Sequence, residues 1–108
     1  MNRLVIRPEA DRDTDLVADY FARVANVDVA LRFLNALSEG YERLQEHPYV
    51  GTRVTTFDTR LPELRFWPVP GFETYLIFYQ AVAGAIDVVR VLHGVQDLER
   101  TLGESTRG

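Results

Sequence analysis

Two side chains that could take part in chemistry stand at the end of the most apolar stretch of the chain. Arg90 and His93 close a run of mostly apolar residues from Ala85 to Leu92. His93 could act as a general acid or base, because an imidazole exchanges its proton near neutral pH, or it could cap the strand end against a backbone carbonyl. Arg90 shares a predicted strand face with Ile86 and Val88, so it either pairs with an acid or projects toward a partner.

A third candidate is Arg65, which directly precedes Phe66 and Trp67. A basic and aromatic grouping of this kind suits stacking on RNA bases, and it equally suits the core of a sheet. A series of acidic residues near the N-terminus superficially suggests a metal site, but its spacing scatters the carboxylates around a helix and favours a solvated face. These acidic residues are Glu9, Asp11, Asp13, Asp15 and Asp19.

Composition narrows the class of protein. A chain of 108 residues with 46% hydrophobic content predicts one domain, residues 1–108, with a single core. No cysteine is present, and His47 and His93 are the two imidazoles, so we expect neither a metal site nor a cofactor. The net charge of −4 argues against specific binding to nucleic acid through phosphate contacts.

The sequence also lacks the features of a membrane or exported protein. The apolar run in Met1–Arg7 is too short for a signal peptide, and no stretch approaches the roughly 18 consecutive apolar residues of a membrane span. We therefore expect a soluble, cytoplasmic protein with no membrane partner.

The first half of the chain predicts a strand followed by two helices. Leu4–Arg7 reads as a short strand, and Pro8 then suits the first turn of a helix. Asn26 or Asp28 can cap a second helix that ends near His47, and the short linker makes the helices antiparallel neighbours. The apolar stripe expected to be the buried face of the first helix comprises Leu16, Val17, Tyr20, Phe21 and Val24.

The second half predicts extended structure. A strand is placed at Glu63–Pro68, at a sheet edge or ending there because Pro68 cannot donate a ladder hydrogen bond. Tyr75–Val82 and Ala85–Leu92 form a hairpin around a tight Ala83-Gly84 turn, followed by a short helix at Val95–Leu102. Residues 103–108 are expected to fray. The fold class is α+β, ordered β-α-α-β-β-β, with the helical hairpin packed on one face of a small, mostly antiparallel sheet.

Both faces of the predicted central strand are apolar. Tyr75, Ile77 and Tyr79 share one face, and Leu76 and Phe78 share the other. Because the helices can cover only one face, the other is expected to be concave or covered by a partner.

Several motifs, in their order and spacing, resemble the ParE branch of the RelE/ParE toxin superfamily over nearly the whole chain. The last of them is the most specific. The motifs are Pro8–Ala10, Ala18–Tyr20, Ala30–Leu34, His47–Pro48, Tyr75–Tyr79 and Val89–Gly94.

This resemblance implies the toxin of a type II toxin–antitoxin pair, a plasmid stabilisation protein. ParE toxins act on DNA gyrase, whereas RelE-type toxins cleave mRNA on the ribosome with clustered basic, tyrosine or other proton-transferring residues. Here the arginine of the RelE-type strand falls on Leu76, the C-terminal arginine falls near Gly94, and no Phe, Tyr or Trp follows Tyr79. The departures favour a non-enzymatic toxin that inhibits gyrase by binding.

The resemblance also assigns roles to individual residues. Arg65, Arg90 and His93 are the expected target-binding residues, and they would be the catalytic ones in the alternative reading as a ribosome-dependent mRNA endonuclease. A third reading is a degenerate, non-toxic member that binds only its antitoxin. The expected antitoxin is a ParD-like ribbon-helix-helix protein whose C-terminal segment binds the toxin. The residues expected to contact it are Tyr20, Phe21, Tyr41 and Tyr79.

Overall fold

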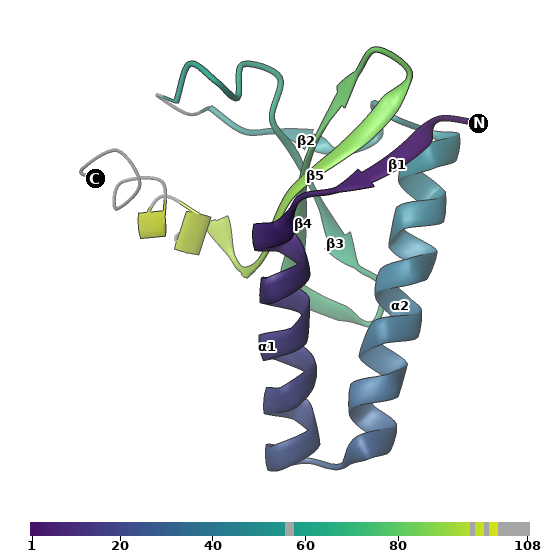
Figure 1. The fold of residues 1–108 in the computed structure, drawn as a ribbon, viewed down its shortest axis with the longest axis vertical. Helices are drawn as coiled ribbons and strands as arrows, with labels where there is room; N and C mark the ends of the chain where they lie inside the picture. Colours follow the sequence, from purple (N-terminus) through teal and green to yellow (C-terminus); the bar gives the residue numbers. More distant parts are fainter. Residues whose placement is uncertain (56–57, 96, 99, 102–108) are drawn as a thin grey trace.

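The computed structural model describes residues 1–55, 58–95, 97–98 and 100–101. Its strands form one sheet in the order β1-β5-β4-β3-β2, in which β1 runs parallel to β5 and the other neighbours are antiparallel. Figure 1 shows these elements: β1 (Arg3–Ile6), α1 (Pro8–Val24), α2 (Val27–Glu46), β2 (Thr52–Arg53), β3 (Arg65–Val69), β4 (Phe72–Val82) and β5 (Ala85–His93). The expected α+β fold, a helical hairpin on a mostly antiparallel sheet, is confirmed.

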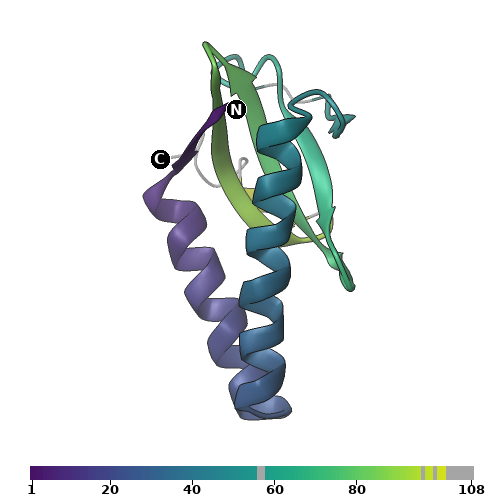
Figure 2. The same cartoon turned by 90° about the vertical axis from the view of Figure 1, so that its right-hand side faces the viewer.

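The two helices lie side by side on one face of the sheet (Figure 2). Pro8 occupies the first turn of α1, where its missing N–H costs nothing. The Oδ1 atom of Asn26 accepts a hydrogen bond from the backbone N–H of Val29 at 2.9 Å, which identifies Asn26 as the cap of α2. The turn that joins the helices lies beyond the end of the sheet in both views, so the last turns of the hairpin have no sheet beneath them.

The main core lies between the helices and the sheet. Its fully buried members include Phe33 and Leu44 from α2, Ile77 and Tyr79 from β4, and Val88 from β5. Burial of each such side chain contributes about 1.5–3 kcal/mol to folding. The predicted alternation of β4 is confirmed, since Ile77 and Tyr79 face the helices.

The opposite face of the sheet is covered by the chain itself. Leu76 and Phe78 of β4 pack there against Leu61 and Leu64, which precede β3, and against Leu98 near the C-terminus. The expectation of a concave or partner-covered face was therefore wrong. Leu61 lies in a segment without helical or strand periodicity, which pattern reasoning treats as a loop. Leu64 lies within the strand predicted at Glu63–Pro68, but in the structure it precedes β3.

The stretch after Gly51 forms only a two-residue strand, which the predicted element order lacked. Thr52 pairs with Phe66, and Arg53 pairs with Arg65. Pro68 of β3 lies beyond the residues that pair with β2. The N–H that proline lacks would therefore have had no partner on that side of the strand.

Positive backbone φ angles mark the two turns that frame β5. Ala83 and Gly84 have φ of 49° and 77°, as a two-residue hairpin turn of type I′ requires. Gly94, with φ of 87°, then ends β5, and the described residues between 95 and 101 are helical, as predicted for a short terminal helix. The expectation that residues 103–108 fray lies outside the described residues.

Candidate partner-binding surface

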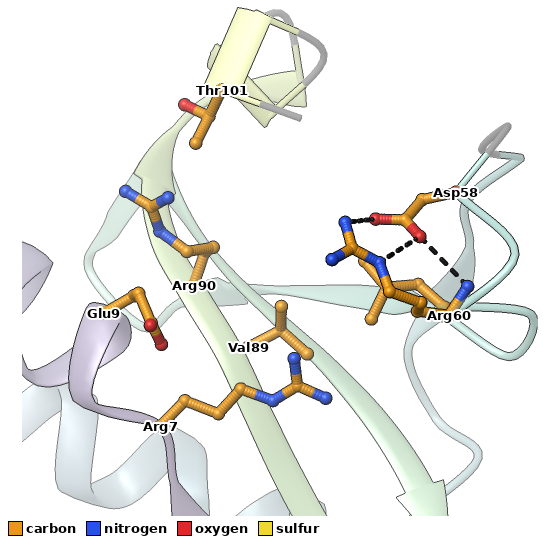
Figure 3. A pocket seen from close by; sticks show the side chains of 8 residues that line it. Arg7, Glu9, Asp58, Arg60, Val89, Arg90 and Thr101 are labelled. Atoms are coloured by element: carbon orange, nitrogen blue, oxygen red, sulfur yellow. Dashed lines mark hydrogen bonds and ion pairs between the residues drawn. The ribbon is translucent and has the colours of Figure 1, made fainter. Parts of the chain in front are cut away.

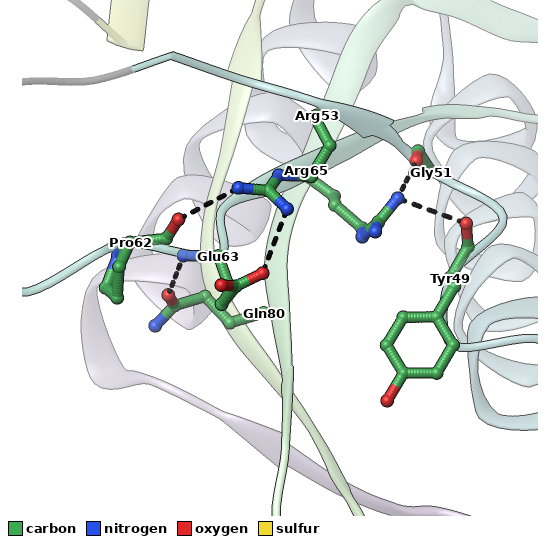
Figure 4. Close-up of polar contacts among 7 residues, drawn as sticks. All are labelled: Tyr49, Gly51, Arg53, Pro62, Glu63, Arg65 and Gln80. Atoms are coloured by element: carbon green, nitrogen blue, oxygen red, sulfur yellow. Dashed lines mark hydrogen bonds and ion pairs between the residues drawn. The ribbon is translucent and has the colours of Figure 1, made fainter.

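The side chain of Arg65 forms hydrogen bonds with the turn between α2 and β2. Its Nη1 atom donates to the backbone oxygen of Gly51 at 2.8 Å and to that of Tyr49 at 3.2 Å (Figure 4). The guanidinium carbon also lies 5.5 Å from the centroid of the Tyr49 ring, in cation–π range. Arg65 therefore holds a turn in place, and its own contacts are with this turn rather than with Phe66 or Trp67.

The hydroxyl of Tyr79 on β4 also forms hydrogen bonds with this turn. It donates to the backbone oxygen of Pro48 at 2.8 Å and accepts from the N–H of Gly51 at 2.9 Å. A Cβ atom at residue 51 would lie 2.5 Å from that hydroxyl, so only glycine fits there. Burial raises the pKa of Tyr79, and the Gly51 N–H and the charge of Arg65 oppose the rise.

Arg90 is held by a carboxylate of α1. Its Nε and Nη2 atoms each donate to Asp13 at 2.7 Å, and the buried backbone N–H of Val91 donates to the same carboxylate at 3.0 Å. The register of β5 shifts beside Phe78, so that Val89 is an extra residue at a β-bulge. Of the two roles considered for Arg90, the structure places it in an ion pair, and its side chain retains 22% exposure.

Three arginines surround a hollow of about 190 Å³ on the side of β5 that faces away from α2 (Figure 3). Each binds a carboxylate through its Nε and Nη2 atoms: Arg7 binds Asp87, Arg60 binds Asp58, and Arg90 binds Asp13. Glu9 adds a further negative charge to the lining. The hollow is therefore not a basic patch, since each guanidinium is balanced by an acid.

His93 is the last residue of β5, and its exposed side chain contacts the ring of Tyr75. The two ring centroids are 5.1 Å apart with an interplanar angle of 80°, an edge-to-face contact. Tyr75 packs in turn on Phe21 and Phe33 at centroid distances of 5.7 and 5.5 Å. His93 therefore borders the aromatic cluster that joins α1, α2 and β4.

The three expected target-binding residues lie at separate places. Arg65 pairs with Tyr79 on β4, whereas His93 pairs with Tyr75, four residues away along the same strand. Four strand residues span about 13 Å, and Arg90 lies between them bound to α1. The structure therefore does not bring these residues together as one cluster.

The four residues expected to contact the antitoxin differ in exposure. Tyr20 is 46% exposed, and Phe21 is partly buried beneath it. Tyr41 is 7% exposed, and Tyr79 has no exposed surface. In this structure, Tyr20 offers the largest free surface of the four, whereas Tyr79 shapes the turn described above from inside the core.

An exposed apolar row on the helical hairpin was only partly foreseen, because the sequence placed most of the α1 stripe in the core and singled out Tyr20 and Phe21 as antitoxin contacts. Val17 and Phe21 do pack on the core, but Leu16, Tyr20 and Val24 are 64%, 46% and 59% exposed. The two rows lie about 100° apart around the helix, which is within the width of an ordinary buried stripe, so spacing alone could not separate them. Across the hairpin turn, Val27 and Leu31 of α2 are also exposed, at 63% and 52%.

Within the part of the chain that the structure describes, no group of three His, Asp or Glu side chains is placed to hold a metal ion. None of the helices there has the length and apolar character needed to cross a membrane.

The amino-acid sequence matches a known family of toxins. The family model described as the ParE toxin of the parDE type II toxin–antitoxin system matches residues 4–98. The chain therefore belongs to the ParE toxin family, and it is a ParE-type toxin of a type II toxin–antitoxin system.

Comparison with solved structures agrees on the fold. The chain is similar to a chain of the chromosomal ParDE toxin–antitoxin system from P. aeruginosa, with a TM-score of 0.71 and 17% sequence identity. The match covers 87% of this chain and 97% of that one. No curated protein matches the sequence.

Proposed function

We propose that this toxin acts in the cytoplasm by binding DNA gyrase and inhibiting it, and that a cognate antitoxin neutralises it by covering the helical hairpin. The exposed row of Leu16, Tyr20 and Val24 carries the part of the proposal that concerns the antitoxin. An isolated exposed apolar side chain is ordinary on a protein surface, but a row at helical spacing is the pattern that a partner helix or strand covers.

Binding rather than catalysis is supported by the placement of the candidate residues. Cleavage of RNA without a metal needs a proton acceptor, a proton donor and a cation around one phosphate. Arg65 and Arg90 are instead engaged by a turn and by Asp13, and His93 lies on Tyr75 at a distance from both. We therefore place Arg65 and Arg90 on the target-binding side of the molecule, and His93 at the border between that side and the surface that the antitoxin covers.

The charge around the row indicates the chemistry of the antitoxin segment. Asp15 and Asp19 are exposed on α1 beside Leu16 and Tyr20, and the chain carries a net charge of −4. Charge complementarity favours an amphipathic segment with basic flanks. We expect this segment to be the C-terminal part of a ribbon-helix-helix antitoxin.

A variant pair tests the antitoxin half of the proposal. Val24→Asp places a charge on the exposed row, and Val82→Asp makes the same change at the 41% exposed tip of the β-hairpin. Coexpressed antitoxin should fail to neutralise the Val24→Asp toxin and should still neutralise the Val82→Asp toxin. Equal neutralisation of both variants would remove the hairpin as the antitoxin site.

The target half is tested by the kind of damage that the toxin causes in cells. Expression without antitoxin should induce the DNA-damage response before translation falls, because poisoned gyrase breaks DNA. Arrest of translation with cleaved transcripts would instead establish the nuclease reading, and harmless expression would establish a non-toxic member.

A further inference from the structure

A second exposed feature adjoins the apolar row on α1, at the end of the sheet. Here Tyr20, Tyr75 and His93 form a series of aromatic rings that is linked through Phe21. Ring centroids are 5.6 Å apart between Tyr20 and Phe21, 5.7 Å between Phe21 and Tyr75, and 5.1 Å between Tyr75 and His93. Tyr20 and His93 are exposed, and Tyr75 is partly so. A partner that lies along the α1 row therefore meets these rings next.

The hydroxyl oxygens of Tyr20 and Tyr75 can accept hydrogen bonds from a partner. Neither the Tyr20 hydroxyl nor the Tyr75 hydroxyl forms a hydrogen bond with the described part of the chain, and neither is buried without a partner. Burial raises the pKa of Tyr75, and the Tyr20 phenol and the Asp97 carboxylate raise it further. The Asp97 carboxylate is already paired with Arg100 at 2.7 Å, so the two hydroxyls are the acceptors that this region offers to a partner.

Aromatic rings and phenol oxygens together attract a cation. An arginine side chain matches both, because its planar guanidinium stacks on aromatic rings, donates several hydrogen bonds and keeps its charge. Its carbon stem would lie on apolar surface of the kind that Leu16 and Tyr20 supply. The acidic residues beside the α1 row, Asp15 and Asp19, favour the same charge.

We propose that Tyr20, Tyr75 and His93 form a binding site for an arginine side chain of the partner segment that covers the α1 row. This inference rests on the proposed function for the identity of the partner, but the site itself can be tested without any antitoxin. The arginine would anchor one end of the segment, as large side chains in partly closed pockets anchor protein interfaces.

Nuclear magnetic resonance titration of the purified toxin with N-acetyl-arginine amide tests the site. The ring protons of Tyr20, Tyr75 and His93 should shift together at millimolar concentration. N-acetyl-citrulline amide, which has nearly the same shape without the charge, should shift them at least threefold less at equal concentration. Equal effects of the two compounds, or shifts confined to other residues, would overturn the proposal.

Variants that keep the net charge show whether arginine amide binding depends on these side chains or only on the overall charge of the protein. Tyr20→Leu removes a ring and Tyr75→Phe removes a hydroxyl acceptor, so each should weaken arginine amide binding about three- to tenfold. Tyr75→Phe retains the ring that packs on Phe21 and Phe33. The control is Tyr49→Leu, which alters a 71% exposed tyrosine outside the site and should leave the binding unchanged. An equal loss in the Tyr49→Leu variant would contradict the site.

The two proposals can fail separately. If antitoxin still neutralises the Val24→Asp toxin while arginine amide still binds, the antitoxin site is wrong and the cation site stands. If citrulline amide binds as well as arginine amide while the Val24→Asp toxin escapes neutralisation, the cation site is wrong and the antitoxin site stands.

Discussion

The Asp13 carboxylate joins α1 to the bulged edge of β5, so its removal should cost a large part of the stability of the fold. Asp13 is 7% exposed and accepts three hydrogen bonds, two from Arg90 and one from the buried N–H of Val91. Asp13→Ala leaves that N–H without a partner and Arg90 without its counter-ion. Breaking a buried pair costs about 3–5 kcal/mol, and the partial exposure of Arg90 favours the lower value.

We therefore expect Asp13→Ala to lower the free energy of unfolding by about 3 kcal/mol. At about 4 °C per kcal/mol for a domain of this size, the Tm should fall by about 12 °C. Asp13→Asn retains an acceptor for Val91 but loses the charge, so its loss should lie near half of that value.

Urea unfolding followed by circular dichroism measures these changes. The control is Asp15→Ala, which removes an exposed carboxylate two residues along α1 and should change stability by less than about 0.5 kcal/mol. The double variant with Arg90→Ala should show a coupling energy of at least about 1 kcal/mol. A loss below about 1 kcal/mol for Asp13→Ala, or equal losses at Asp13 and Asp15, would refute the reasoning.

Three further predictions concern the turn between α2 and β2 and an ion pair near the hollow. Gly51→Ala places a Cβ 2.5 Å from the Tyr79 hydroxyl and should cost about 2 kcal/mol or more in urea unfolding; an unchanged midpoint would contradict the close fit. Tyr79→Phe leaves the Pro48 oxygen and the Gly51 N–H unpaired and should cost about 2 kcal/mol, seen also as faster exchange of the Gly51 amide. The hydrogen bonds from Arg60 lower the pKa of Asp58 to about 2, so the stabilisation from this pair is present above the unfolded pKa near 4 and is lost as pH falls through about 2. A carboxyl NMR titration should find that value, and Arg60→Ala should raise it part of the way toward 4, because the backbone N–H of residue 60 still donates to Asp58; a wild-type value already near 4 would show that the pair does not form in solution.

Local signals in the sequence were sufficient to predict most of the elements. Pro8 and Asn26 begin the two helices as expected, and the Ala83-Gly84 turn joins β4 to β5. Each of these depends on the chemistry of one or two residues: a ring that fixes φ, a side chain that caps a helix, and a residue that tolerates positive φ.

Features that depend on distant contacts were not predictable in the same way. Arg90 and its partner Asp13 are 77 residues apart, and the bulge at Val89 that accompanies this contact has no local signature. Likewise, Leu61 covers a sheet face from a segment with no periodicity. The sequence predicted that Tyr79 lies in a strand, but it did not predict the hydrogen bonds of the Tyr79 hydroxyl, because their partners lie in a turn about 30 residues earlier.

The candidate site was likewise predictable where it depends on local spacing and not where it depends on distant contacts. Sequence spacing identified the α1 stripe, but it could not show which of the two adjacent rows the sheet would leave uncovered. The structure leaves Leu16, Tyr20 and Val24 exposed, because the row of Val17 and Phe21 packs on the core. The rings of Tyr75 and His93 then extend this surface at the end of β4 and β5.

A gyrase supercoiling assay tests whether the toxin acts on gyrase. Purified toxin should inhibit supercoiling of relaxed plasmid or trap cleaved DNA at micromolar concentration. The Val24→Asp toxin should act on gyrase as the wild type does, because Val24 belongs to the surface assigned to the antitoxin. Normal supercoiling in the presence of folded toxin at these concentrations would contradict the account.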